Sequence, residues 1–284
     1  MDIIEPDVYA KQKSNAQLIA MQSIDSLNTY NNNKSYDQIV DIGCGDGDIT
    51  KQLLGKHIRH KHILAIDVLP DMITYARNHN SDDTIEYLVQ DMSVEWPLIS
   101  SPRLRQLAGN VDLIFSNLAL EYMADKRQIV DTFGQLLSTG GVFHANLVIM
   151  EDINKRLASY GRPPKQQWYQ SREKQLDNWR QSLSSDNQFL VKQFEIIDVC
   201  WPTDRQKMID FMPIIISKYR QFFQNTDDFE SEKIDHLWDT AFDALVNPTA
   251  DTPNPRAWQQ FLADPTVTVV NRYHQLLRIT AVKQ

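Results

Sequence analysis

The sequence lacks long apolar runs and has few cysteines. No stretch approaches the ~18 consecutive apolar residues that a membrane-spanning helix needs, and no charged, apolar and small-residue leader precedes the first predicted helix. Its two cysteines, Cys44 and Cys200, cannot build a disulfide framework, which favours a reducing compartment. We therefore expect a cytoplasmic protein without a membrane span.

Long runs of positive charge are also missing. The net charge is −8, and the best basic cluster, at residues 56–62, is short. Because a nucleic-acid partner requires a patch of Lys and Arg for its phosphates, we expect no such partner. The histidines of this cluster follow the spacing H-x-x-H-x-H in a predicted loop, where solvated side chains are more common than a metal site, so we expect no metal.

Three glycines interrupt the pattern after a short apolar run. Residues 41–49 read Asp-Ile-Gly-Cys-Gly-Asp-Gly-Asp-Ile, between a predicted strand and a predicted helix. Such a turn lets the backbone approach a ligand and ends at a helix N-terminus. The spacing G-x-G-x-G is not the dinucleotide fingerprint, and no Gly-Lys-Ser/Thr of a P-loop follows. The acidic loop would repel phosphate and attract an ammonium group, which favours S-adenosylmethionine as the ligand.

An acidic residue stands where such a ligand needs one. Asp67 ends the apolar run at 62–66, twenty residues after Gly47. An α/β nucleoside site places a carboxylate there for the ribose hydroxyls. The loop and Asp67 together resemble the class I S-adenosylmethionine-dependent methyltransferases, whose motif is E/D-x-G-x-G-x-G followed by an acid that closes the second strand.

The alternation of strands and helices predicts the fold class. The first five strands are expected at residues 38–42, 62–67, 84–89, 111–116 and 141–148, and the helices between them at residues up to about 55, 70–80 and 125–137, the last one ended by Gly140-Gly141. Strands separated by such helices form a parallel sheet that is covered on both faces. Later strands at 194–200 and 272–282 would complete it. We therefore expect an α/β fold with a doubly wound, mostly parallel seven-stranded Rossmann-like sheet.

Three regions follow from this pattern. Residues 1–35 are expected to form an N-terminal helical cap, residues 36–150 the cofactor-binding α/β core, and residues 151–284 the remaining sheet with a helical substrate cap at about 201–270, inserted between the last two strands. The inserted segment is rich in Met, Phe, Ile and Trp, which suits an apolar wall around a substrate. Such a stripe is equally typical of the core of the cap, and both interpretations stay open.

The candidate cofactor-binding residues follow the predicted strand ends, because ligands of an open parallel sheet lie outside the carboxyl ends of its strands. They are Asp41, Gly43, Cys44, Gly45, Asp67, Val68, Met72, Asp91, Met92 and Asn117. Asp41 would receive the ammonium group, the glycine loop would offer backbone contacts, and Asp67 would take the ribose. Val68 and Met72 would lie beside the adenine, and Asp91 and Met92 would bind its amino group and cover its ring.

The residues after the fourth strand bear on the methyl acceptor. Residues 116–119 read Ser-Asn-Leu-Ala, where methyltransferases of amide and exocyclic amino nitrogens commonly carry Asp/Asn-Pro-Pro-Tyr, so a small molecule is favoured. A carboxylate acceptor is already ionised near pH 7, since carboxyl pKa values are about 4, and it needs alignment rather than a base. Gln17 and Tyr122 are the candidate catalytic residues that would orient this acid, with Gln22 as the alternative to Gln17.

A narrower resemblance spans more of the chain. The regions at 9–22, 40–47 and 72–76, the inserted cap and the last strand are similar to arthropod juvenile hormone acid methyltransferases. The resemblance implies methyl transfer to the carboxylate of farnesoic or juvenile hormone acid, whose apolar chain would suit the cap. Residues 120–122 read Leu-Glu-Tyr where that family has Leu-His-Trp, and Glu121 would repel an acid if it faced the pocket.

Three functions stay open on the sequence. The first is methyl transfer to the carboxylate of an apolar small molecule. The second is methyl transfer to another small acid or an amine, of the trans-aconitate type, and an amine is favoured if Glu121 faces the pocket. The third is cofactor binding without turnover, since the intact loop and Asp67 indicate binding only.

Overall fold

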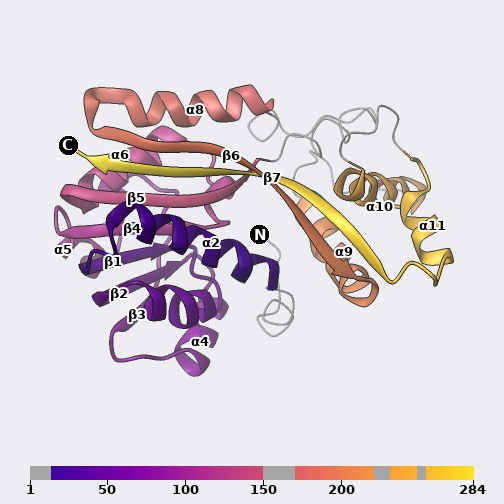
Figure 1. Cartoon of the computed structure of the whole chain (residues 1–284), viewed down its shortest axis with the longest axis horizontal. Coiled ribbons are helices and arrows are strands. Elements are labelled where there is room, and N and C mark those ends of the chain that lie inside the picture. Colours follow the sequence, from indigo (N-terminus) through magenta and orange to yellow (C-terminus); the bar gives the residue numbers. More distant parts are fainter. Residues whose placement is uncertain (1–13, 150–169, 221–230, 248–253) are drawn as a thin grey trace. The chain divides into compact units, whose positions relative to one another are not determined.

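The computed structural model describes residues 14–149, 170–220, 231–247 and 254–284 (Figure 1). The predicted helical positions before residue 14 and the stretch 150–169 lie outside these described residues. The sheet has the seven strands that the sequence predicts, in the order β3-β2-β1-β4-β5-β7-β6. The strands are β1 (Tyr36–Ile42), β2 (His60–Asp67), β3 (Ile85–Val89), β4 (Val111–Asn117), β5 (Leu137–Ile149), β6 (Phe189–Asp204) and β7 (Val269–Lys283).

The first five strands form the parallel part of the sheet. Parallel pairs join β1 to β2, β1 to β4, β2 to β3 and β4 to β5. The strand order reverses at β1, which lies between β2 and β4, so the carboxyl ends of these two neighbours open on either side of the glycine loop. This is the position at which a doubly wound sheet binds its ligand, and the predicted fold class is confirmed.

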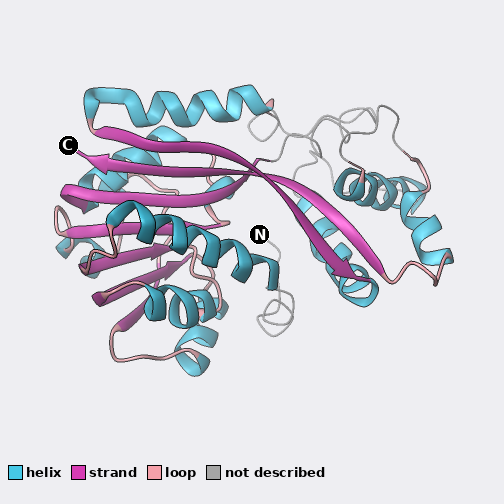
Figure 2. Cartoon of the chain, in the orientation of Figure 1, coloured by secondary structure: helices cyan, strands magenta, loops and turns pink. Residues whose placement is uncertain are grey.

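Helices flank the strands along the chain (Figure 2). Those between residues 14 and 136 are α2 (Ser14–Asn31), η1 (Thr50–Leu54), α3 (Gly55–His57), α4 (Pro70–His79), η2 (Trp96–Leu98), α5 (Pro102–Gln106), η3 (Leu120–Tyr122) and α6 (Lys126–Leu136). The later ones are α8 (Arg172–Ser184), η4 (Ser185–Asn187), α9 (Arg205–Arg220), α10 (Ser231–Val246) and α11 (Ala257–Ala263). None of the described helices is long and apolar enough to cross a bilayer.

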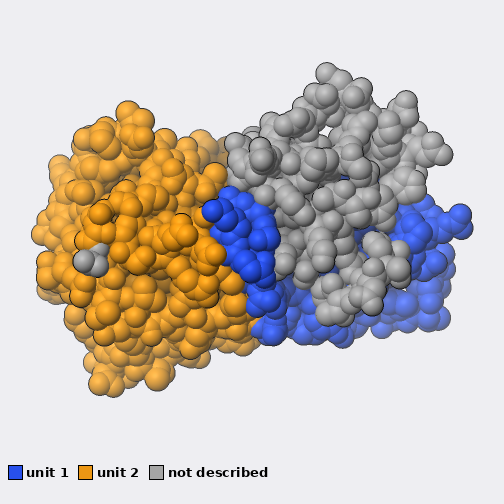
Figure 3. Space-filling model, turned by 90° about the horizontal axis from the view of Figure 1, so that it is seen from above, with its two compact units in different colours: residues 1–4, 149–175, 198–275 blue, residues 5–148, 176–197, 276–284 orange. Residues whose placement is uncertain are grey.

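Two compact units divide the chain (Figure 3). We call residues 5–148, 176–197 and 276–284 the sheet unit, and residues 1–4, 149–175 and 198–275 the insertion unit. Each is described by itself. The three regions predicted from the sequence, and the role of the insertion as a cover for the substrate, stay predictions.

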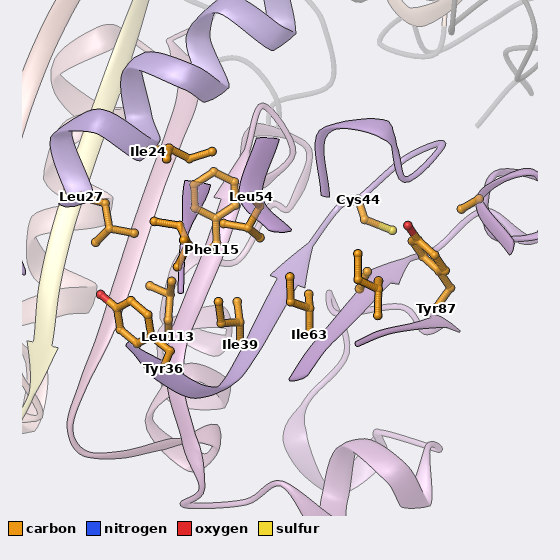
Figure 4. Packing of buried hydrophobic residues seen from close by; sticks show 14 of the residues in the cluster. Ile24, Leu27, Tyr36, Ile39, Cys44, Leu54, Ile63, Tyr87, Leu113 and Phe115 are labelled. Atoms are coloured by element: carbon orange, nitrogen blue, oxygen red, sulfur yellow. The ribbon is translucent and has the colours of Figure 1, made fainter. Parts of the chain in front are cut away.

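One core cluster of the sheet unit lies on the face that α2 covers. Ile39 of β1 is the register neighbour of Leu113 on β4 and of Ile63 on β2, so a row of branched side chains crosses three strands. Ile24 and Leu27 of α2 pack in the same cluster (Figure 4). Near-continuous apolar runs are what a parallel sheet covered on both faces requires, because burial of apolar surface supplies most of its stability.

The opposite face of β5 carries α6 and α8. Phe143 of β5 packs against Phe133 of α6, with ring centroids 4.7 Å apart, and stacks with Trp179 of α8 at 6.3 Å. Successive side chains of a strand point to opposite faces of the sheet, so Phe143 faces α6 and α8 whereas the next residue, His144, points towards α2.

The expected role of Gly140-Gly141 as the end of a helix is wrong. Helix α6 ends at Leu136, and both glycines lie within β5, next to a register shift between β4 and β5. Gly140 has φ +79°, and a Cβ on Gly141 would lie 2.8 Å from the Ser138 carbonyl oxygen and 2.9 Å from that of Val111. Gly140 therefore serves a positive φ, and Gly141 serves a close backbone approach in a strand.

The insertion unit has an apolar core of its own, built from α9, α10 and α11. Met208, Met212 and Phe242 are buried in it, and Trp258 and Phe261 of α11 pack against Phe242. Buried Asp239 of α10 accepts hydrogen bonds from the backbone N–H groups of Trp258 and Gln259, at 2.8 and 3.1 Å, and so caps α11. The helical insertion is confirmed, and these apolar side chains belong to its core.

Candidate cofactor site

The glycine loop turns sharply between β1 and the helix that begins at residue 48. Gly43, Gly45 and Gly47 have φ values of +77°, +55° and +78°, a region that side-chain-bearing residues rarely adopt. A Cβ on Gly43 would lie 2.2 Å from the Cβ of Ala119, which follows β4. One on Gly47 would lie 2.7 Å from the Tyr87 hydroxyl oxygen. The spacing of the glycines thus reflects both backbone conformation and two neighbouring walls.

The N–H groups of the loop tie it to the end of β2. Gly43 and Cys44 donate to the Ile66 carbonyl oxygen at 2.8 and 3.0 Å, and Gly45 donates to Asp67 Oδ2 at 2.9 Å. No donor within the described part of the chain reaches the Gly43 carbonyl oxygen. An ammonium group is a donor that needs such acceptors, so the predicted backbone contacts of the loop would come from its carbonyl groups.

Asp67 ends β2 with both carboxylate oxygens facing backbone donors. Oδ2 accepts from Gly45, and Oδ1 accepts from the Leu69 N–H at 2.9 Å. Burial raises the pKa of this carboxyl group, and the backbone hydrogen bonds oppose the shift. Each carboxylate oxygen retains acceptor capacity beyond one hydrogen bond, so a pair of ribose hydroxyls fits here. Nearby in sequence, Val68 is exposed and Met72 is buried.

Asp41 lies one step behind the loop. Its side chain is only 3% exposed, and Oδ2 accepts a hydrogen bond of 2.6 Å from Thr50 Oγ1. Burial raises the pKa of Asp41 to about 7, the Thr50 hydrogen bond opposes this shift, and the negative charge of Asp67 adds to it. Thr50 opens a π-helical turn, a local geometry that is frequent at functional sites. The predicted contact of Asp41 with an ammonium group stays a prediction.

Asp91 and Met92 follow β3. Asp91 Oδ1 accepts from the Ser93 backbone N–H at 2.8 Å and from its hydroxyl at 2.6 Å, which closes a tight turn, and Met92 is buried. The Gln90 N–H donates to the Asp67 carbonyl oxygen at 3.0 Å, so this turn is attached to the end of β2. The adenine contacts predicted for the pair stay predictions.

Asn117 ends β4 with a polar atom that needs a partner. Its Nδ2 donates to the Ala16 carbonyl oxygen of α2 at 3.3 Å, whereas its buried Oδ1 has no hydrogen-bond partner within the described residues. Buried polar atoms are almost always satisfied, which points to a donor that a ligand or water supplies. The next residue, Leu118, has φ +58°, a strained conformation of the kind that clusters at functional sites.

The N-terminal part of α2 distinguishes the two glutamines. Gln17 Nε2 donates to Asp48 Oδ2 at 2.7 Å, at the first helical residue after the glycine loop, and Gln22 is exposed. Gln17 is therefore the glutamine that the structure brings to the loop.

The helix start after β4 contains a lysine, Lys126, that sequence reasoning missed. Lys126 Nζ donates to the carbonyl oxygens of Leu120, at 2.8 Å, and of Met123, and lies 5.3 Å from the ring centroid of Trp179. Burial lowers the pKa of Lys126 to about 8, and the negative charge of Glu121 opposes this shift. The charges of Lys126 and Glu121 thus interact electrostatically. A lysine at a helix start gives no signal of burial in the sequence.

Tyr122 follows Glu121 in η3. Burial raises the pKa of its phenol, and the charge of Glu121 adds to the shift, so the hydroxyl keeps its proton at any physiological pH. Its role in orienting an acid stays a prediction. As for metals, the described part of the chain contains no group of three His, Cys, Asp or Glu side chains that would hold an ion.

Comparison with known proteins concerns the segment that holds most of these residues. Residues 40–143 match the family model described as a methyltransferase domain. The chain is 35% identical to the malonyl-[acyl-carrier protein] O-methyltransferase of Acetivibrio thermocellus over 138 residues, which cover 48% of this chain and 42% of the relative. It is 28% identical to a ubiquinone biosynthesis O-methyltransferase of Xylella fastidiosa over 123 residues, 43% of this chain and 44% of the relative. The alignments thus span less than half of each relative.

The structural comparison concerns the fold alone. The crystal structure of a candidate methyltransferase from Bacillus halodurans C-125 superposes with a TM-score of 0.55 at 14% sequence identity, over 92% of this chain and 98% of that one. The superposition agrees with the predicted Rossmann-like fold. The match over residues 40–143 confirms the predicted methyltransferase domain, and S-adenosylmethionine is the cofactor that such a domain uses. The narrower likeness to juvenile hormone acid methyltransferases stays a prediction.

Proposed function

Because residues 40–143 match a methyltransferase domain, we propose that the protein transfers a methyl group from S-adenosylmethionine to an oxygen of a small molecule. The acceptor that we propose is the carboxylate of an apolar acid, such as farnesoic or juvenile hormone acid. The observation that carries the proposal is the Asp67 carboxylate, held by the Gly45 and Leu69 N–H groups at the end of β2.

The chain's own groups fit the cofactor. Asp67 would accept hydrogen bonds from the ribose hydroxyls, and the Gly43 carbonyl, with the negative charge of Asp41 behind it, would receive the ammonium group. The unpaired Oδ1 of Asn117 would accept from a donor on the ligand side. Bound S-adenosylmethionine would supply a methyl group on a positively charged sulfonium.

A carboxylate acceptor does not need a general base from the protein. It is ionised near pH 7, so the site has to align it and to exclude water. The Tyr122 hydroxyl, which keeps its proton, and the second N–H of the Gln17 amide are suitable donors to a carboxylate. Lys126 offsets the charge of Glu121, which removes part of the repulsion expected for an acid.

Two observations bear on the alternatives. The names of both relatives, O-methyltransferases, favour an oxygen acceptor. Glu121 favours an amine acceptor if its carboxylate contacts the substrate. Cofactor binding without turnover is the non-enzyme alternative, because the loop geometry concerns binding alone.

The test is methyl transfer from labelled S-adenosylmethionine to farnesoic acid, fatty acids, aconitate and alkyl amines, with Asp67→Ala as the control for cofactor dependence. We expect label in a product of an acid that alkali hydrolyses to labelled methanol, as an ester does. Label that resists alkali and enters only the amines would replace the proposal with the amine alternative. Binding of S-adenosylmethionine without transfer to any acceptor in the panel would favour the non-enzyme.

A further inference from the structure

Arg272 of β7 is a buried cation in the insertion unit. The residue is only 5% exposed, and its guanidinium lies 4.2 Å from the ring centroid of Phe211 and 5.5 Å from that of Trp201. Its Nε donates to Thr203 Oγ1 at 2.9 Å. Within the described residues, Nη1 and Nη2 have no hydrogen-bond partner and no carboxylate pairs with the group. Because a buried charge is costly, such a group is normally paired.

A second arginine of the same unit, Arg205, has hydrogen-bond acceptors for its terminal nitrogens. Arg205 also stacks on an aromatic ring, with its guanidinium 4.5 Å from the Phe261 centroid. Its Nη atoms donate to the carbonyl oxygens of Phe261, Asp264, Val267 and Leu262. Arg272 shares the stacking and lacks these acceptors, so its terminal donors serve no contact in the described part of the fold.

His274 lies two residues further along β7 and beside the same tryptophan. Its ring centroid is 4.2 Å from that of Trp201, and its buried Nε2 makes no hydrogen bond within the described residues. Burial lowers the pKa of His274 to about 3, and the charge of Arg272 adds to this shift, so the ring is neutral. Positions two apart in a strand face the same side. The Arg272 guanidinium and the His274 imidazole, each with nitrogens that make no hydrogen bond within the described residues, therefore lie on the same side of β7.

The geometry suits one class of ligand. The guanidinium carbon lies over the rings of Trp201 and Phe211, and Thr203 accepts from its Nε. Within the described residues, this leaves Nη1 and Nη2 as the atoms of the group without a hydrogen bond. Two parallel N–H groups of an arginine match the two oxygens of a carboxylate. The surrounding aromatic side chains suit an apolar group attached to that carboxylate.

We propose that Arg272 and His274 form a carboxylate-binding site in the insertion unit, positioned by Thr203 and Trp201 and occupied by an organic acid with an apolar part. The site shares no residue with the proposed cofactor site, and the proposal does not depend on methyl transfer.

The test uses the full chain without S-adenosylmethionine and measures binding of sodium hexanoate by calorimetry. Hexan-1-ol is the uncharged control and inorganic phosphate the alternative oxyanion. We expect hexanoate to bind, and Arg272→Met to weaken it about tenfold or more, as loss of a charged hydrogen-bonded pair does. Arg272→Lys, which keeps the charge without the planar fork, should also bind more weakly. Arg256→Met removes an exposed arginine of the same unit and should change nothing.

Further measurements keep the result decisive. In the wild-type protein the ring ¹⁵N signals of His274, assigned by their loss in His274→Gln, should shift with hexanoate and stay unchanged with hexan-1-ol. This readout needs no arginine variant to fold. Asp67→Ala should bind hexanoate as the wild type does, which separates this site from the proposed function. Hexanoate affinity that is equal in wild type and Arg272→Met, binding of phosphate alone, or static His274 signals would overturn the proposal.

Discussion

The Thr50 hydroxyl donates a hydrogen bond of 2.6 Å to the Asp41 carboxylate, and both side chains are buried. Asp41 lies in β1 and Thr50 opens the π-helical turn of η1, so this bond joins the two elements on either side of the glycine loop. The loop is thereby closed by a side-chain contact as well as by its backbone.

Thr50→Val should destabilise the protein. The valine keeps the shape of threonine but leaves the buried Asp41 carboxyl group without its donor, which costs about 1–3 kcal/mol of unfolding free energy. Urea denaturation measures this loss. Thr50→Ser retains the hydroxyl and should lie closer to the wild type. A valine variant as stable as the wild type would show that the hydrogen bond contributes nothing.

The raised pKa of Asp41 predicts a dependence of stability on pH. Its carboxyl group has a pKa of about 7 in the folded protein against an ordinary value of 3.8. The folded state therefore binds more protons than the unfolded state between these values, and the stabilising contribution of Asp41 is lost as pH rises from about 4 to about 7. The difference in unfolding free energy between wild type and Asp41→Asn should fall over this range. A constant difference would contradict the raised pKa.

His144 should act in the opposite sense. Its ring nitrogens form hydrogen bonds with the Ser23 and Thr280 hydroxyls, at 2.9 and 2.8 Å. Burial lowers the pKa of His144 to about 3, and the charge of Arg278 adds to this shift. The unfolded state then binds more protons between pH 3 and 6.5, so the contribution of His144 is present above this range and is lost as the pH falls. The unfolding free energy of the wild type relative to His144→Gln, followed from pH 7 to pH 4, should decrease.

The parts of the site that the sequence predicts are those that depend on local spacing. The loop glycines and Asp67 lie within 25 residues of each other, and chain conformation and the end of one strand determine their places. The strand lengths were less accurate, since β6 extends over Phe189–Asp204 and the sequence predicts only 194–200. At its N-terminal end the polar pair Lys192-Gln193 separates the apolar Phe189-Leu190-Val191 from the predicted run, and at the other end Pro202 is atypical of a strand.

The sequence does not predict contacts between residues that lie far apart along the chain. Asn117 meets the Ala16 carbonyl 101 residues away, and Lys126 lies over Trp179. In the sequence Arg272 and His274 look like ordinary exposed positions of a strand. Only the packing against Trp201 and Phe211 shows that Arg272 is buried and His274 half-buried. Such pairs depend on tertiary arrangement, which periodicity does not encode.

Gly43→Ala should abolish cofactor binding, and Gly140→Ala provides the matched control. Both glycines have similar φ values, +77° and +79°, so both alanines suffer the same backbone strain of about 1–2 kcal/mol. A Cβ at Gly140 has nothing within 4 Å, whereas one at Gly43 would lie 2.2 Å from the Ala119 Cβ. Binding of S-adenosylmethionine by calorimetry should be retained in Gly140→Ala alone. Equal loss in both variants would assign the effect to strain instead of to the contact with Ala119.

Asp67→Ala should weaken S-adenosylmethionine binding by about 1–3 kcal/mol, the usual cost of losing hydrogen bonds to a charged group. The alanine also releases the Gly45 and Leu69 N–H groups, so part of the loss would come from the loop itself. Asp67→Asn keeps one acceptor oxygen of the two, and with it one of these loop contacts, so its loss of affinity should lie between the wild type and Asp67→Ala. Adenosine, which has the ribose without the ammonium group, should lose affinity to the same extent in Asp67→Ala. Undiminished adenosine binding would show that this carboxylate does not contact the ribose.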